Sequence, residues 1–162
     1  MKEKIEFILE KACKKIYKQD KCLINNCANE RAIVFRLGIY IQRLMSRDTE
    51  LKFYNLDNEY NRNGQEPKRI QDFENGTYPD LIIHKRESNK NNMSIIECKT
   101  EWNDDIHKDM QKIREFINTT GEYKYKYGVS IVFRRNSVEI RILEYGVEDV
   151  FKSINMNCRE EK

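Results

Sequence analysis

The sequence has few of the residues and patterns that mark domain boundaries or membrane segments. Only two prolines and six glycines occur in 162 residues, and no Pro/Gly/Ser-rich stretch divides the chain. We therefore expect a single domain over residues 1–162. No apolar run is long enough for a secretory signal or a membrane span. This predicts a cytoplasmic protein with no membrane partner.

Cysteine, histidine and net charge also give little indication of function. The five cysteines, at positions 13, 22, 27, 98 and 158, lack CxxC or paired-hairpin spacing and suit reduced thiols. With only two histidines, a structural zinc site is a poor expectation. Lys and Arg number 30 against 27 Asp and Glu, a net charge of +3. Such an excess permits contact with a polyanion but does not by itself indicate one.

Apolar residues at helical spacing predict three helices. The first covers residues 2–18, and a second follows a cap at Asn25, Asn26 or Asn29. The third covers residues 105–118, and its cap is expected at Asn103 or Asp104. For the tail, residues 146–162, we expect a short helix or a frayed end.

Strand patterns lie between these helices. Alternating aromatic residues predict a strand over 50–61, and a long polar loop follows it. Further strands are predicted at 81–84, 93–98, 128–133 and 138–145, the first two joined as a hairpin. The expected order is helix, helix, three strands, helix, two strands.

Three charged residues stand at the ends of buried β segments. Asp80 directly precedes one segment, and Glu97 and Lys99, two residues apart, end the next and so point to the same side of the sheet. Burying such ions costs several kcal/mol each unless they pair or bind something. A Glu97–Lys99 ion pair would offset this free-energy cost. If Asp80 lies on the neighbouring strand, however, two carboxylates at 4 Å repel by about 4 kcal/mol, which a divalent cation would remove.

The order of these residues resembles a known family. Pro79-Asp80, an apolar strand, a hairpin and then Glu97-Cys98-Lys99 are similar to the PD-(D/E)xK nuclease superfamily. The resemblance implies an α/β fold with a restriction-endonuclease-like three-layer core, α-β-β-β-α-β, whose central mixed sheet is flanked by helices. This core would cover about residues 25–145.

The resemblance also implies an activity and a cofactor. The protein would be a Mg²⁺- or Mn²⁺-dependent endo- or exonuclease that hydrolyses phosphodiester bonds with a metal-activated water, in DNA rather than RNA. Lys99 would orient the water, and Lys112 would steady a phosphate. The implied metal ligands are Asp80, Glu97, the backbone carbonyl of Cys98 and, as an outer or second ligand, Glu30.

Glu30 and Lys112 each have a simpler explanation. Glu30 lies on the apolar stripe of its helix, but a Glu at a helix N-terminus is also favoured by the macrodipole. Lys112 could instead form an i,i+3 salt bridge with Asp109.

Glu59 and Trp102 are further candidates at the edge of the site. Glu59 could flank the cleft, although charged strand ends are usually only solvated. Trp102 could stack on a base, although such a residue more often covers a core edge. We leave His84 and His107 out of the site, because isolated histidines are usually surface or packing residues.

Two other classes of protein compete with the nuclease. One is a catalytically weak nucleic-acid-binding subunit of a restriction, repair or mobile-element complex with the same fold. The other is a structural domain in which the three charges form an ion-paired network and bind no metal. Cutting both strands would favour a homodimer, but no residue pattern selects a dimer surface or a sequence specificity.

Overall fold

The computed structural model describes residues 1–70, 76–103, 105–147 and 150–156. Its helices are α1 Lys2–Gln19, α2 Lys21–Asn25, α3 Glu30–Met45 and α4 Ile106–Ile117, with 3₁₀ turns η1 Leu51–Phe53 and η2 Asn89–Asn91. Its strands are β1 Asn55–Asn58, β2 Arg62–Asn63, β3 Glu66–Pro67, β4 Leu81–His84, β5 Ser94–Thr100, β6 Tyr127–Phe133, β7 Ser137–Leu143 and β8 Val150–Asn155.

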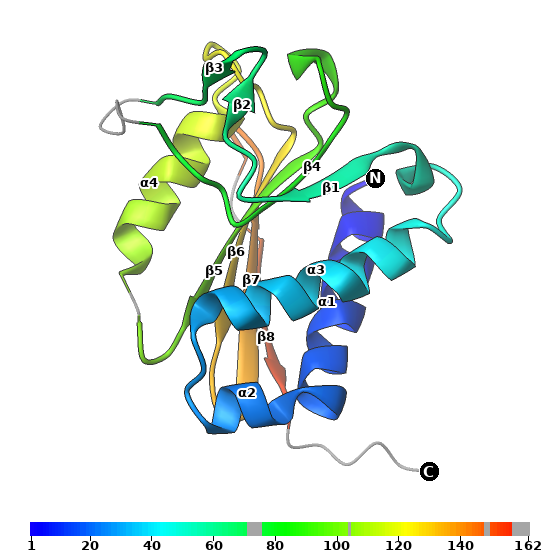
Figure 1. Ribbon diagram of the computed structural model, residues 1–162, viewed down its shortest axis with the longest axis vertical. Coiled ribbons are helices and arrows are strands. Elements are labelled where there is room, and N and C mark those ends of the chain that lie inside the picture. Colours follow the sequence, from blue (N-terminus) through cyan, green and yellow to red (C-terminus); the bar gives the residue numbers. More distant parts are fainter. Residues whose placement is uncertain (71–75, 104, 148–149, 157–162) are drawn as a thin grey trace.

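One mixed sheet organises the molecule. Six strands follow the order β1-β4-β5-β6-β7-β8, and β2 and β3 form a separate small hairpin. Only β5 and β6 run parallel, and the other neighbours in the sheet are antiparallel. Parallel strands need a crossover, which α4 supplies here. Figure 1 shows α4 on one side of this sheet and α1 and α3 on the other. The expected α/β fold with a mixed sheet between helices is therefore confirmed at this level.

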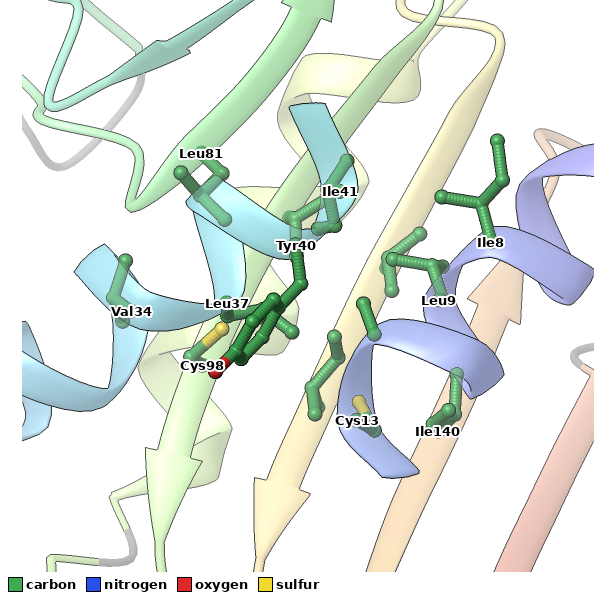
Figure 2. Packing of buried hydrophobic residues seen from close by; sticks show 14 of the residues in the cluster. Ile8, Leu9, Cys13, Val34, Leu37, Tyr40, Ile41, Leu81, Cys98 and Ile140 are labelled. Atoms are coloured by element: carbon green, nitrogen blue, oxygen red, sulfur yellow. The ribbon is translucent and has the colours of Figure 1, made fainter. Parts of the chain in front are cut away.

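The larger apolar cluster lies between the sheet and the pair α1 and α3. Their buried stripes combine with the side chains that point to this side from β4, β5, β6 and β7. Figure 2 shows Cys98 of β5 in this cluster with Leu37 and Tyr40 of α3. Each is 1% exposed or less. At about 25 cal/mol per Å² of apolar surface, this face supplies most of the hydrophobic stabilisation.

A smaller apolar cluster lies between the sheet and α4. Ile82 and Ile95 of the sheet pack there against Ile113 and Phe116 of α4. The approach is close at Gly128 of β6, where an added Cβ would lie 2.2 Å from Ile113 Cγ2. A side chain at this position would push α4 away from the sheet.

Helix α3 begins at one of its expected caps. The Asn29 side-chain oxygen accepts a hydrogen bond from the Arg31 backbone N–H at 2.9 Å. The cap of α4 differs, since this helix follows Asp105. Asp104, one of the two expected caps, lies outside the described residues.

The strand expected over 50–61 and the loop expected after it were only partly right. Only Asn55–Asn58 of the region 50–61 is a strand. Before it, the Asp48 carboxylate accepts hydrogen bonds from the backbone N–H groups of Glu50 and Leu51, each at 2.8 Å, which favours a turn instead. The long loop after β1 contains the β2–β3 hairpin.

The tail also differs from the expected short helix. Its residues Val150–Asn155 form β8, which pairs with β7. Ile154 and Met156 pack against the larger apolar cluster, so sheet pairing and apolar burial outweigh the local helical pattern. The expectation for residues 157–162 lies outside the described residues.

None of the helices in the described ranges combines the length and apolarity needed to cross a membrane. Cys13, Cys22, Cys27 and Cys98 are free thiols, and Cys158 lies outside the described residues.

Candidate functional site

The ends of β4 and β5 bring Asp80 and Glu97 together. Asp80 and Glu97 each lie one residue beyond the paired residues Leu81 and Ile96. Asp80 Oδ2 accepts a hydrogen bond from the Cys98 backbone N–H at 2.7 Å. The expected convergence of two acidic side chains on neighbouring strands is therefore present in the structure.

Glu97 is a buried carboxylate with a lysine partner. Its exposure is 3%, and Lys112 Nζ of α4 lies 2.7 Å from Oε1. This contact is an ion pair, and Lys112 Nζ also donates a hydrogen bond to the Tyr78 carbonyl at 3.0 Å. Burial raises the pKa of Glu97 to about 8, because it outweighs the opposing effect of Lys112.

Lys99 occupies the centre of a second group of charges. Its Nζ lies 3.3 Å from Glu30 Oε1 at the start of α3 and 3.2 Å from Asp109 Oδ2 on α4. Burial would lower the pKa of Lys99, but the two carboxylates outweigh it and raise this pKa. Lys99 therefore stays charged at neutral pH and links the two helices across the strand end.

Four carboxyl groups thus share one region with two ammonium groups. The pKa values of Glu30, Asp80 and Asp109 are raised, in each case chiefly by burial. If all six groups are ionised, four negative and two positive charges leave a net charge of −2. We call these residues the charged cluster: Glu30, Asp80, Glu97, Lys99, Asp109 and Lys112.

Three oxygens of the charged cluster are buried without a hydrogen-bond partner among the described residues: Glu30 Oε2, Glu97 Oε1 and Asp109 Oδ2. Two of them already lie beside a lysine ammonium, at 2.7 Å for Glu97 Oε1 and 3.2 Å for Asp109 Oδ2, whereas Glu30 Oε2 forms no ion pair among the described residues. Because buried polar atoms are normally satisfied, Glu30 Oε2 needs an explanation, and a ligand that carries positive charge would provide one.

All five side chains assigned from the sequence contribute to the charged cluster. Glu30 is the first residue of α3, so the macrodipole explanation also fits its position, but its side chain reaches Lys99. Lys112 pairs with Glu97, and the i,i+3 alternative does not describe its observed contact.

Asp109 is the member of the cluster that sequence reasoning missed. We considered it only as a salt-bridge partner for Lys112, whereas it contacts Lys99 of β5. Its position three residues before Lys112, on the same helical face, was the available signal.

Glu59 and Trp102 have different surroundings. The Glu59 backbone N–H donates to the Asp80 carbonyl at 3.3 Å, and its carboxylate pairs with Arg31 at 3.1 Å, so Glu59 lies at the edge of the cluster. Trp102 packs against the larger apolar cluster, which agrees with its simpler explanation.

The two histidines are not members of the charged cluster. His84 is 3% exposed and its Nε2 lies 2.8 Å from Asp57 Oδ2, whereas His107 is exposed. Both observations agree with packing and surface roles.

The cluster fits a divalent cation by the chemistry of its donors. Carboxylate oxygens are the hard ligands that Mg²⁺ prefers, and the buried oxygens without hydrogen bonds could serve as such ligands. In the described ranges, however, no three His, Cys, Asp or Glu side chains are already arranged to hold a metal. The positive charge between the carboxylates is here supplied by Lys99 and Lys112.

Comparison with known proteins gives no match: no family model, curated protein or solved structure is significantly similar to this chain.

Proposed function

We propose that the protein is a Mg²⁺- or Mn²⁺-dependent nuclease of the PD-(D/E)xK type, with a restriction-endonuclease-like core. The observation that carries the proposal is the charged cluster, in which four carboxyl groups share one region with only two lysines. Supporting it, α3, β1, β4, β5, α4 and β6 follow one another in the α-β-β-β-α-β order, apart from the inserted β2–β3 hairpin. Asp80 and Glu97 also come from adjacent strands, as this type of site requires.

The proposed metal ligands are Asp80, Glu97, the backbone carbonyl of Cys98 and Glu30. The N–H and C=O groups of one strand residue point to the same side. Because the Cys98 N–H points to Asp80, its carbonyl is directed to the same edge, beyond the paired end of β4. The chemistry supplied by such an ion is polarisation of a phosphoryl oxygen and a lower pKa for bound water.

The two lysines have distinct proposed roles. Lys99 keeps its charge because Glu30 and Asp109 raise its pKa, so its ammonium can orient the attacking water and offset charge on the phosphoryl group. Lys112 pairs with Glu97 in the structure. With a metal ion held by Glu97, Lys112 would be available to hold a phosphate oxygen.

Exposed cations near the cluster suit a polyanionic substrate. Arg31 follows Glu30 at the start of α3, and Lys108 precedes Asp109 on α4. Their side chains are 83% and 75% exposed. Such residues raise the local concentration of nucleic acid and make its binding salt-dependent. We propose DNA rather than RNA as the substrate.

The decisive experiment combines metal binding with cleavage. The full chain is incubated with Mn²⁺ or Mg²⁺ and with plasmid, linear or single-stranded DNA or RNA, while Mn²⁺ binding is followed by calorimetry. We expect Asp80→Asn and Glu97→Gln to stay folded, to weaken Mn²⁺ binding and to lower cleavage at least about 100-fold, or ~2.7 kcal/mol in the barrier. Glu144→Gln, which changes a carboxylate that follows β7 and pairs with Lys2 of α1, is the matched control.

The results separate the competing classes. Cleavage that is unchanged in either variant rejects the site. Salt-sensitive binding without cleavage supports the alternative of a catalytically weak nucleic-acid-binding subunit. An ion-paired network is also what a purely structural domain would show, and absence of both Mn²⁺ and nucleic-acid binding would favour that class.

A further inference from the structure

A polar cavity of about 300 Å³ lies at the other end of β4 from Asp80. Its lining includes residues from the β2–β3 hairpin, from the end of β4 and from the turn that follows β4: Tyr60, Arg62, Lys68, His84, Glu87 and Asn89. We call it the Lys68 pocket. Nothing in the proposed chemistry of the charged cluster uses these residues.

Lys68 is the unusual residue of this pocket. It is 2% exposed, although buried lysines are rare unless they are paired. Its Nζ donates a hydrogen bond to the Arg62 carbonyl at 2.6 Å and lies 4.6 Å from the centre of the Tyr60 ring. Among the described residues no carboxylate forms an ion pair with it.

The carboxylate whose charge raises the pKa of Lys68, that of Asp57, is already engaged. Asp57 Oδ2 lies 2.8 Å from His84 Nε2, and Arg86 donates hydrogen bonds to both carboxylate oxygens of Asp57. Burial lowers the pKa of Lys68 to about 8, and Asp57 only partly opposes this effect. The ammonium is therefore still the main form at pH 7, and it is a buried positive charge without a counterion of its own.

We propose that the Lys68 pocket binds a phosphate group, whose negative charge completes the partial set of contacts around the Lys68 ammonium. The argument is the geometry of the pocket. Lys68 and the exposed Arg62 supply positive charge to its lining, and Glu87 is the one acidic residue there. The amide of Asn89, also in the lining, already donates to Asn63 Oδ1 at 2.8 Å. A hydrogen bond between a charged donor and a phosphate oxygen is about twice as strong as a neutral one.

The pocket lies on the same side of the sheet as the charged cluster. Asp80, Ile82 and His84 alternate along one strand and so point to one face, and Ile82 packs in the cluster on the α4 side. Four residues of strand separate Asp80 from His84 by about 13 Å at ~3.3 Å per residue. If the proposed function holds, the phosphate belongs to the substrate strand, a few nucleotides from the bond that is cut. A free phosphate or a mononucleotide would offer the same chemistry.

The test compares Lys68→Met with Lys85→Met in the full chain, with EDTA present. Met keeps the length of the lysine stem, and Lys85 is an exposed lysine that follows β4 directly. Inorganic phosphate and a single-stranded oligonucleotide are titrated separately by calorimetry and by NMR of the Lys68 side chain in the wild type. We expect Lys68→Met to lower the affinity for at least one of the two ligands about tenfold or more. Lys85→Met should change the affinity for either ligand less than about twofold.

Each outcome decides the proposal. Weaker binding of inorganic phosphate identifies a site for free phosphate groups, whereas an effect on the oligonucleotide alone identifies a backbone phosphate contact. Equal binding of both ligands by wild type and Lys68→Met, or wild-type Lys68 resonances that do not respond to either ligand, overturns the proposal. If Lys68→Met does not fold, the wild-type resonances still decide it. Because EDTA prevents metal-dependent cleavage, the result is independent of whether the charged cluster is a nuclease site.

Discussion

The two faces of strand β5 bury different kinds of side chain along the same short strand. On the face toward α1 and α3, Ile96 and Cys98 are fully buried in an apolar cluster. On the α4 face, Ile95 is equally apolar, but Glu97 and Lys99 follow it and contact charged residues. The change occurs within one strand, where β4 stops pairing with β5.

The face of β5 toward α1 and α3 stabilises the fold, whereas the buried charges on the α4 face lower its stability. A buried ion pair is often no better than apolar residues of similar volume, and can be worse, because both ions lose their hydration. The α4 face also carries raised carboxyl pKa values and oxygens without hydrogen bonds. Local departures from the rules of packing are expected at functional sites, and here several buried charged groups gather at one end of one face.

The largest effect on stability is expected on the apolar face. Leu37 is fully buried against the sheet, so Leu37→Ala removes apolar contacts and leaves a cavity. We expect the free energy of unfolding to fall by about 2–5 kcal/mol in urea titrations. Phe35→Ala, on the same helix but 63% exposed, should change it by less than about 0.5 kcal/mol. Equal losses in the two variants would contradict this description of the core.

On the α4 face of β5, removing buried charges should raise the free energy of unfolding. Replacing both partners of the buried pair, in Glu97→Met/Lys112→Met, is expected to raise the free energy of unfolding by about 1–4 kcal/mol. Lys112→Met alone leaves the Glu97 carboxylate without its ammonium and should destabilise the protein. Chemical denaturation of the single and double variants measures both effects. A double variant less stable than the wild type would show that this face contributes to stability as well.

A substitution at Gly128 tests the α4 face by displacing α4 from the sheet. The added methyl group of Gly128→Ala would collide with Ile113 Cγ2, and we expect a loss of about 1–3 kcal/mol. Ile113→Ala in the same chain removes the obstructing methyl groups, so the second substitution should cost less there than in the wild type. Because α4 carries Asp109 and Lys112, metal binding should weaken together with stability. Additive losses in the double variant would rule out this close contact.

Much of the fold could be predicted from local patterns, and the exceptions have a common cause. The helix expected at 105–118 is Ile106–Ile117, because a strong apolar stripe determines it. By contrast, β8 exists through its pairing with β7, a contact between segments that no local pattern of residues 150–155 reveals.

The same distinction applies to the charged residues. Alternation along β5 placed Glu97 and Lys99 on one face, and this is confirmed by their contacts with α4. Asp109 was missed because its partner lies on another element. Lys68 gave no signal in the sequence, since its burial depends on the β2–β3 hairpin and on backbone hydrogen bonds to Asn61 and Thr77.

A further expected effect is a dependence of stability on pH that distinguishes the two faces. The pKa of Glu97 is raised to about 8 from its ordinary value of 4.5, so the folded protein binds more protons than the unfolded chain between these limits. Stability contributed by this proton is therefore present below pH 4.5 and is lost as the pH rises to about 8. One such group changes the free energy of unfolding by at most about 1.4 kcal/mol per pH unit.

We expect Glu97→Gln to gain stability relative to the wild type as the pH rises through this window, whereas Leu37→Ala should lower stability by a constant amount. Urea titrations at several pH values between 4.5 and 8.5 measure both differences. A Glu97→Gln difference that does not vary with pH would mean that Glu97 is ionised throughout, and Lys112 would then outweigh the effect of burial.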